Sequence, residues 1–381
     1  MFYFDYASAT PVRKEALKAM LPFFSKSFGN PSSIHKMGVE AKRAIEEARQ
    51  HVAELVGARA DSVVFTSGAT ESINLALFGA LKVHRAVGRH VVASATEHQA
   101  TLEALKSEGF EVTIVPVDRS GIVKVEDVIS AIRPDTILIH VMAVNNEVGT
   151  INPINEIGRE ILRLKKPKPG LPPSKTPLFH VDAAQAVQYL DLSVERDHLD
   201  LLSFGSAKIG GPKGAGALII SPNARIEPIL FGGNQERGLR AGTENVPGIV
   251  GFGVAAQLVF AEREKETKRL GSLRRLFIRE LHRVIPGAIV NGDPKLVTPH
   301  IVNVQIPGKD SEEIVLRLDA KDIFISSASA CTNPSARSHV LRAMGFSEDE
   351  VRSSIRVSFG HGTKKGDVLV FIAKLKETGI V

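Results

Sequence analysis

Short apolar runs recur along the first two thirds of the chain, and they do not alternate with polar residues. Each run is five to nine residues long and is bounded by turn-forming or helix-forming segments. A strand that is covered on both faces is typically apolar along its whole length, as in parallel sheets. The runs therefore predict the strands of a mostly parallel sheet, at 62–66, 90–95, 112–117, 136–144, 178–182, 200–204 and 216–220.

The segments between these runs have helical character. The segment at 38–58, GVEAKRAIEEARQHVAELVGA, places its apolar residues at helical spacing. Strands that alternate with helices predict an α/β domain in which helices flank the sheet on both faces. The Pro- and Lys-rich segment 165–177 can be neither helix nor inner strand, and we expect a surface loop there.

The pattern changes after about residue 255. A long charged helix is predicted at 261–285, followed by fewer strands, at 300–306, 322–326 and 354–359. We expect a large domain at 14–255 and a smaller α+β domain made of 1–13 and 256–381, the N-terminal strand completing the latter. The segment GFGVAA (251–256) loosely matches a dinucleotide fingerprint, but no strand precedes it, so packing glycines within a helix are favoured over NAD binding.

Composition is that of a globular protein and narrows the choice of partner. Of 381 residues, 43% are hydrophobic and 24% charged, and the net charge of +6 raises the question of RNA or an acidic partner. The basic residues are dispersed, however, so nucleic acid is not favoured. A basic, non-enzymatic RNA- or protein-binding module stays open as an alternative.

The number of cysteines and the lack of long apolar runs favour a reducing compartment inside the cell. Cys331 is the single cysteine, which excludes an internal disulfide, and no Cys/His spacing resembles a metal site. The N-terminus does not read as a signal peptide, and no run of about 18 apolar residues is evident. We expect a cytoplasmic protein without a membrane segment and without a bound metal.

One lysine has an unusual setting. Lys208 lies in SFGSAKIGGPKGAGA (203–217), among small residues and between two predicted strands. Small neighbours leave room for a long side chain to reach a ligand and swing away. Low polarity around it would depress the pKa of the amine and make it a better nucleophile.

Other predicted strands also end in polar groups. In an open α/β sheet such groups gather at the edge where ligands bind. The turn at Gly68 opens a predicted helix whose amides, with the Thr70 hydroxyl, could cup an anion, although simple helix capping would use the same residues. The remaining candidates are Ala69, His98, Asn146, Glu147, Asp182 and Gln185.

Taken together these groups fit pyridoxal 5'-phosphate. The lysine would bind the cofactor's aldehyde covalently, a carboxylate would keep the pyridine nitrogen protonated so that the ring accepts electrons, and the anion cup would hold the phosphate. None of the groups is distinctive alone. Their combination in one pocket is what this cofactor requires.

The sequence resembles the cysteine desulfurases, a branch of the class V aminotransferase family with the type I fold of pyridoxal-phosphate enzymes. The resemblance covers nearly the whole chain in a fixed order of motifs. These are FYFDYASATP (2–11), FGNPSS (28–33), FTSGATES (65–72), TEHQA (96–100), NNEVGT (145–150), HVDAAQA (180–186), GPKGAGAL (211–218), GLRAGTENV (238–246), SSASACT (326–332) and SSIRVSFG (353–360).

The resemblance implies a role for each matching residue. Lys208 would hold the cofactor, Asp182 would pair with its ring nitrogen, and His98 would stack on the ring and assist proton transfer. Cys331 would take the sulfur of L-cysteine as a persulfide and release L-alanine. Asn146 and Gln185 would lie near the ring hydroxyl of the cofactor, and Ala69 and Thr70 would bind its phosphate. Arg356 would bind the substrate carboxylate, and Asn146 would also lie near the substrate.

The resemblance also implies partners. Thr243 would reach the phosphate bound by a neighbouring subunit, so a homodimer is expected. A sulfur acceptor or an iron–sulfur scaffold protein is a further possible partner. A different reaction on the same cofactor, such as selenocysteine lyase or aminotransferase chemistry, would keep Lys208 and Asp182 and need not use Cys331.

The sequence departs from the family just before the lysine. Members usually carry Ser-Gly-His there, and the serine and histidine help to bind the phosphate, whereas this chain has Gly205, Ser206 and Ala207. We expect Ser206 to compensate in part. The loop after Cys331 is also about one residue shorter than usual and lacks Leu-Glu-Pro.

For two of these residues, Cys331 and Arg356, the local sequence independently supports the implied role. Cys331 follows a short predicted strand in a loop of small and polar residues, which suits exposure and movement. Arg356 lies in an apolar strand and needs an anionic partner there, which a structural ion pair could supply as well as a substrate.

Overall fold

A seven-stranded sheet organises most of the chain. The computed structural model describes residues 1–107, 109–165, 177–327 and 337–379. The strand order is β2-β8-β7-β6-β5-β3-β4; β8 is antiparallel to both neighbours and the other neighbouring pairs are parallel. All seven predicted strands are present, as β2 (Val63–Thr66), β3 (His90–Ser94), β4 (Glu111–Val115), β5 (Thr136–Met142), β6 (Leu178–Asp182), β7 (Leu201–Gly205) and β8 (Gly216–Ile220).

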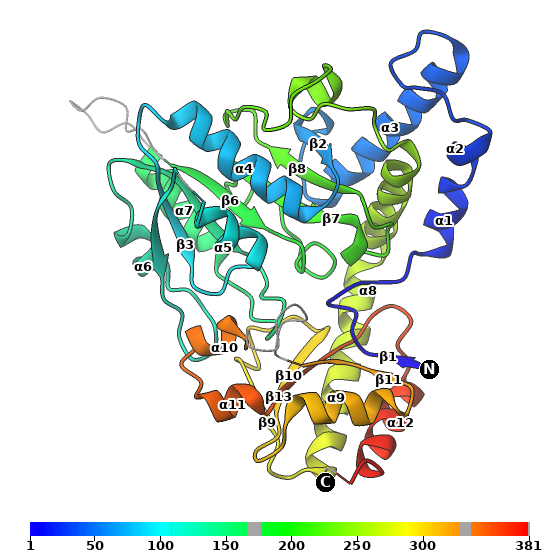
Figure 1. Cartoon of the computed structure of the whole chain (residues 1–381), viewed down its shortest axis with the longest axis vertical. Helices are drawn as coiled ribbons and strands as arrows, with labels where there is room; N and C mark the ends of the chain where they lie inside the picture. The colour runs from blue at the N-terminus through cyan, green and yellow to red at the C-terminus, as the bar shows by residue number, and fades with distance from the viewer. Residues whose placement is uncertain (108, 166–176, 328–336, 380–381) are drawn as a thin grey trace.

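Helices cover both faces of this sheet (Figure 1). Neighbouring residues of β3 contribute to different cores, because successive strand side chains point to opposite faces. Val91 packs with the apolar residues of α4 (Ala69–His84), whereas Val92 packs in the core shared with α3 (Lys36–Leu55). The other helices of this region are α1 (Lys14–Met20), α2 (Pro22–Ser25), α5 (Gln99–Leu105), α6 (Val125–Ser130) and α7 (Ile154–Lys165).

The longest helix, α8 (Val246–Val284), begins 15 residues before its predicted start at 261. The Asn245 side chain caps it by accepting a hydrogen bond from the Gly248 amide at 3.1 Å. The glycines of the 251–256 segment lie in this helix, as predicted. A Cβ at Gly253 would lie 2.5 Å from the Ala48 Cα, so the glycine permits α3 and α8 to pack closely.

By length and composition α8 could also cross a membrane, alone among the helices of the described ranges. Half of its most apolar stretch is buried inside the protein, however, and Phe252, Ala255 and Val259 belong to the sheet-facing core. The core of a folded protein thus accounts for its apolar character.

The C-terminal third builds two smaller sheets. One has the order β12 (Ser326–Ser327), β13 (Ser354–Ser358), β10 (Ile301–Gln305), β9 (Ile289–Val290), and the other pairs β1 (Phe2–Tyr3) with β11 (Ile323–Phe324) in parallel. The single strand predicted at 322–326 is therefore wrong. The chain forms two short strands there instead: β11 pairs with β1, and β12 pairs with β13 of the other sheet.

The N-terminal strand joins this C-terminal region, as predicted. Phe4 packs edge-to-face on Phe359 and Phe371 in a core with Phe277 of α8. The remaining helices are α9 (Ser311–Asp319), α10 (His339–Ala343), α11 (Glu348–Arg352) and α12 (Lys365–Lys376). The domain boundary predicted at 255/256 falls inside α8, and the division into two domains stays a prediction. Most of the 165–177 loop lies outside the described residues.

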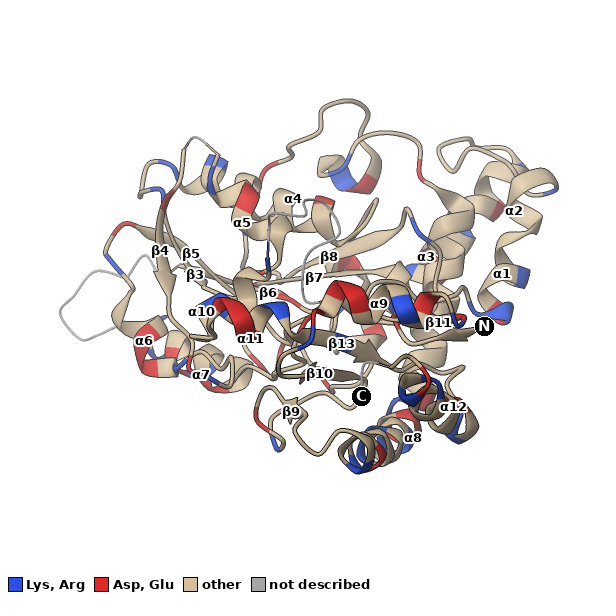
Figure 2. Cartoon of the chain, turned by 60° about the horizontal axis from the view of Figure 1, so that its bottom comes forward, with Lys and Arg blue, Asp and Glu red and all other residues tan. Residues whose placement is uncertain are grey.

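Charged residues of both signs are mixed along the helices of the face in Figure 2. Many are paired: Arg269 contacts Glu266, and Arg283 contacts Glu280. Alternating signs do not make the continuous basic surface that nucleic acid binding requires. Among the described residues, no group of three or more His, Cys, Asp or Glu side chains could hold a metal ion.

Candidate active site

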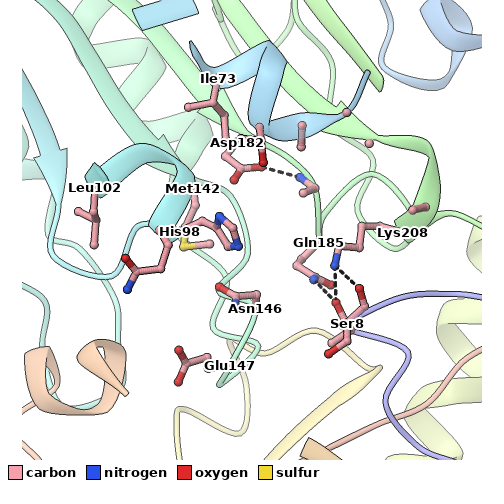
Figure 3. A pocket seen from close by; sticks show the side chains of 18 of the residues that line it. Ser8, Ile73, His98, Leu102, Met142, Asn146, Glu147, Asp182, Gln185 and Lys208 are labelled. Carbon is pink, nitrogen blue, oxygen red and sulfur yellow. Dashed lines mark hydrogen bonds between the residues drawn. The ribbon is translucent and has the colours of Figure 1, made fainter. Parts of the chain in front are cut away.

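A cleft of about 1070 Å³ lies where the large sheet meets the N-terminal segment and the β12–β13 edge. Its walls bring together residues that are far apart in the sequence, as Figure 3 shows. Ends of parallel strands supply several of them, which is the expected place for a ligand in this architecture. The predicted site residues that line it are Ala69, Thr70, His98, Asn146, Asp182, Gln185, Lys208 and Arg356.

Lys208 projects into the cleft from the short helix η2 (Ser206–Lys208), directly after β7. Its amine donates hydrogen bonds to the carbonyl oxygens of Ala7 at 2.9 Å and Ser8 at 2.5 Å. Burial, with the nearby Arg356 charge, lowers the pKa of Lys208 to about 8. The lowered pKa agrees with the sequence-based expectation and leaves a usable fraction of neutral, nucleophilic amine near neutral pH.

Asp182 lies at the end of β6 with its carboxylate in the cleft. One oxygen accepts a hydrogen bond from the Ala184 amide at 2.9 Å, and no Lys or Arg among the described residues pairs with it. Burial raises the pKa of Asp182, so a cation is needed beside it to keep the carboxylate ionised. The protonated ring nitrogen of pyridoxal phosphate is a cation of this kind.

Gln185 is held from two sides. Its amide nitrogen donates to the Ala7 carbonyl at 2.8 Å, and its oxygen lies 3.0 Å from His300 Nε2. Burial lowers the pKa of His300 to about 3, so this histidine is neutral. Because an amide has two hydrogens and two lone pairs, Gln185 keeps one donor and one acceptor for a ligand.

The N-terminus of α4 forms the predicted anion cup. Gly68 precedes the helix with φ 157°, and the structure shows no hydrogen bond from the Ala69 or Thr70 amide to another described residue. Glu71 stands close by, but its carboxylate accepts the Ser67 amide at 2.7 Å and pairs with Arg240 at 2.9 Å. Free amides beside a neutralised carboxylate suit a phosphate.

His98 caps α5 and faces the cleft. Its Nδ1 accepts a hydrogen bond from the Ala100 amide at 3.0 Å, which leaves Nε2 as the nitrogen that carries the proton in the neutral ring. Desolvation in the cleft lowers the pKa of His98, and Asp182 opposes that shift. A neutral imidazole is suited to move protons near pH 7.

Arg356 approaches from the opposite wall, on β13. It forms the ion pair that the sequence left open, with Asp5 at 2.8 Å, and also donates to the Ser8 hydroxyl at 2.6 Å and to the Asn146 carbonyl at 2.9 Å. Its Nε is buried without a partner in the described structure. The guanidinium therefore has a structural partner and also lines the cleft, on the side where a substrate carboxylate would bind.

Three predicted residues are not brought into this cleft by the described structure. The Ser206 hydroxyl is buried without a partner and packs against Gly211, where a Cβ would lie 2.0 Å from it. Ser206 is also absent from the cleft lining, so the expected compensation by this hydroxyl has no geometric support. Thr243 is exposed outside the cleft. Cys331 lies outside the described residues.

Sequence reasoning missed groups whose partners are distant in the chain. Asp5 and Ser8 contact Arg356, and nothing in the local sequence indicates that pairing. Glu147 is a sequence candidate that also lines the cleft, but its partner is not apparent from the sequence: burial raises the pKa of Glu147, and its carboxylate accepts a hydrogen bond from Ser338 at 2.5 Å. His339 also lines the cleft, with Nε2 2.9 Å from the Glu97 carbonyl oxygen.

The comparisons with known proteins agree with this site. The family model for aminotransferase class V matches residues 2–371. A putative cysteine desulfurase IscS 1 of Bacillus subtilis is 43% identical over 365 residues, covering 94% of this chain and 93% of the relative. The chain therefore belongs to the class V aminotransferase family, in its cysteine desulfurase branch.

Solved structures give the same fold. A NifS-like protein superposes with a TM-score of 0.91 at 34% identity and covers 99% of each chain. A structure titled "SspA in complex with cysteine" matches with a TM-score of 0.80 at 35% identity, over 94% of this chain and 99% of that one. The predicted α/β class is confirmed, and a non-enzymatic basic module is not supported.

This chain is thus an enzyme of a pyridoxal-phosphate-dependent family, and its residues fit that cofactor. The bound cofactor supplies an electron-accepting ring that weakens bonds around the substrate's α-carbon. Lys208 would hold its aldehyde, Asp182 its ring nitrogen, and the amides of Ala69 and Thr70 its phosphate. Arg356 remains for an anionic group of the substrate.

Proposed function

We propose that this protein converts L-cysteine to L-alanine and passes the sulfur on as a persulfide of Cys331. The observation that supports this most is that one cleft holds both Asp182, a buried carboxylate that needs a cation beside it, and Lys208, an amine whose pKa is lowered to about 8. The family membership and the neighbour solved with cysteine add support.

The reaction needs two further groups besides the cofactor. Arg356, which lines the cleft, would bind the substrate carboxylate, and His98 would move protons at the substrate's α-carbon. The carbon–sulfur bond of cysteine breaks as a sulfur–sulfur bond to Cys331 forms. Cysteine and the Cys331 thiol together become alanine and a Cys331 persulfide, so atoms and electrons balance without another reactant.

We also propose that two copies of the chain form the working enzyme. Large apolar side chains are exposed over one stretch near the N-terminus, the most exposed being Ile34 at 98%. Large exposed apolar side chains are the kind of surface that a protein interface covers. The residues are Leu17, Leu21, Phe24, Phe28, Ile34 and Val39.

In such a homodimer Thr243, exposed and outside its own cleft, would reach the phosphate bound by the other subunit. A thiol on another protein, an iron–sulfur scaffold among the candidates, would then take the sulfur. A cytoplasmic location fits the single cysteine, since that compartment keeps thiols reduced.

Incubation with L-cysteine tests the proposed reaction. The wild type should release alanine and carry an extra 32 Da on Cys331 by mass spectrometry, the mass of one sulfur atom, roughly one per chain. Cys331→Ala should keep the cofactor's visible absorbance and make no protein persulfide. If Cys331→Ala forms alanine and sulfide at the wild-type rate, Cys331 is not the sulfur carrier, and lyase chemistry replaces this proposal.

The position of the cofactor is tested separately. Borohydride reduction followed by peptide mapping should place the cofactor on Lys208. Label on Lys106 or Lys213, the other lysines among the described residues that line the cleft, would refute the assignment.

A further inference from the structure

A buried ion pair lies outside the cleft, at the free edge of the large sheet. Arg49 of α3 and Glu236 of η3 (Gln235–Gly238) form two hydrogen bonds, at 2.7 and 2.8 Å. Their side chains are only 6% and 2% exposed. Burying two charges costs desolvation free energy, so a pair of this kind calls for an explanation beyond stability.

The pair occupies the hydrogen-bonding edge of β2, which ends the strand order on that side. Glu236 accepts a hydrogen bond from the Phe65 amide at 2.9 Å, while Arg49 donates to the Val63 carbonyl at 3.0 Å. Arg237 donates to the same carbonyl at 2.7 Å. The ion pair thus satisfies backbone groups that a further strand would otherwise bind, and it fixes η3 to the sheet.

The backbone of η3 is strained where it is held. Glu236 has φ 45° and Arg237 φ 57°, both in the left-handed region that residues with a Cβ avoid, and Gly238 follows at φ 79°. Such consecutive left-handed residues persist only where surrounding contacts fix them, and they cluster at functional sites. Here the fixing contacts are those of Glu236 and Arg237 with Arg49 and β2.

The strained turn leads directly to Thr243. Arg240 pairs with Glu71 beside the anion cup of the same chain, and the Gly242 amide donates to the Gln235 side chain at 3.0 Å. Ala241 is buried and Thr243 is exposed. The short, tethered segment between η3 and Thr243 therefore sets where the exposed Thr243 side chain lies on the surface of the subunit.

We propose that the Arg49–Glu236 pair positions Thr243 for the phosphate of the cofactor bound by the other subunit. This inference rests on the proposed homodimer in which Thr243 acts across the interface. Glu236 and Arg49 are then positioning residues that touch neither substrate nor cofactor. Their loss should weaken cofactor binding in the neighbouring subunit more than in their own.

Hybrid dimers separate these two effects. Two differently tagged chains are co-expressed, one of them with Lys208→Ala, so that the other alone holds the cofactor covalently. Glu236→Gln is placed either on the Lys208→Ala chain or on the cofactor-holding chain. Cofactor retained during dialysis is fixed with borohydride and counted on Lys208.

We expect loss about tenfold faster when Glu236→Gln is on the opposite chain, the effect of one lost hydrogen bond to a charged group. On the cofactor-holding chain the acceleration should be clearly smaller, because there Glu236 reaches the anion cup only indirectly, through the Phe65 amide and the Arg240–Glu71 pair. Equal acceleration in both arrangements, or none in either, overturns the inference. If Glu236→Gln yields no hybrid dimer, Arg49→Lys, which keeps the charge but not the bidentate geometry, is tested with the same expectation.

Two controls complete the design. Asp61→Asn also converts an acid to its amide near the start of β2, but Asp61 forms an exposed ion pair with Arg59. This variant should leave the rate of cofactor loss unchanged in both arrangements. Thr243→Val tests the underlying homodimer contact and should accelerate loss only from the opposite chain. If Thr243→Val has no such effect, the proposed contact across the interface fails. If Thr243→Val acts and Glu236→Gln does not, the positioning role alone fails.

Discussion

The position before Ser206 offers a direct test of how the cofactor's phosphate is held. The family resemblance implies a serine where this chain has Gly205, and a side chain at that position would point to the Ala69 amide of the anion cup. Gly205 has φ −121° and ψ 143°, an extended conformation that serine adopts without strain. A Cβ added there would lie 3.3 Å from the Ala69 amide nitrogen and 3.6 Å from the Ala69 Cβ. The Gly205→Ser hydroxyl would thus stand within the cup.

The magnitude follows from these contacts. A hydrogen bond to a charged phosphate contributes about 1.5–3 kcal/mol. The 3.3 Å contact is tight and requires a shift of a few tenths of an ångström, for which we allow about 1 kcal/mol. The net gain of about 0.5–2 kcal/mol corresponds to cofactor loss that is roughly 2- to 30-fold slower.

Cofactor retention measures this gain. Visible absorbance is followed during dialysis for wild type, Gly205→Ser and Gly205→Ala. The alanine variant adds the Cβ without the hydroxyl and should lose cofactor at least as fast as wild type. The reasoning is refuted if Gly205→Ser is no slower than Gly205→Ala, because its hydroxyl would then be capping the Ala69 amide and not binding phosphate. Ala207→His, which restores the other missing group, should slow loss further if the turn follows the family's course.

Three further predictions concern the amine, the substrate and the packing of α8. Cofactor uptake by the cofactor-free protein should accelerate with pH and level off above about pH 8, the lowered pKa of Lys208. At pH 7 this pKa leaves about a tenth of the Lys208 amine neutral, whereas the ordinary lysine pKa of 10.5 would leave about 0.03%. A plateau first reached above pH 10 would contradict the lowering of the pKa by burial. Arg356→Gln should raise the KM for L-cysteine at least tenfold, because a charged contact to the substrate carboxylate is lost. The same variant should move the pH profile of cofactor uptake to higher pH, because the Arg356 charge lowers the pKa of Lys208. An unchanged KM would mean that Arg356 serves only in its ion pair with Asp5. Gly253→Ala should lower the melting temperature, because the added Cβ meets the Ala48 backbone and overpacking costs about 1–3 kcal/mol. Gly271→Ala, whose Cβ meets only the flexible end of Arg275, should instead raise the stability by up to about 1 kcal/mol. Thermal unfolding compares the two variants, and equal shifts in melting temperature would mean that α3 and α8 can move apart.

The sequence by itself determined the fold class, because the strand pattern is local. Seven near-continuous apolar runs predicted the seven strands of the large sheet, and burial on both faces requires that pattern. The candidate residues also came from the sequence. The residue types and strand-end positions of Lys208, Asp182 and His98 indicate a site, and the structure brings all three into one cleft. Their roles, and that of Cys331, stay predictions.

Only the tertiary structure decided how these side chains are partnered. Arg356 meets Asp5 across 351 positions of the chain, and Glu236 meets Arg49 across 187, so no local pattern could indicate either pair. The same limit explains Ser206, which has a plausible type and position but turns toward Gly211. Secondary structure follows from spacing along the chain. The direction and charge of a buried side chain depend on which distant elements pack against it, and that is fixed when the sheet, the N-terminal segment and α8 come together.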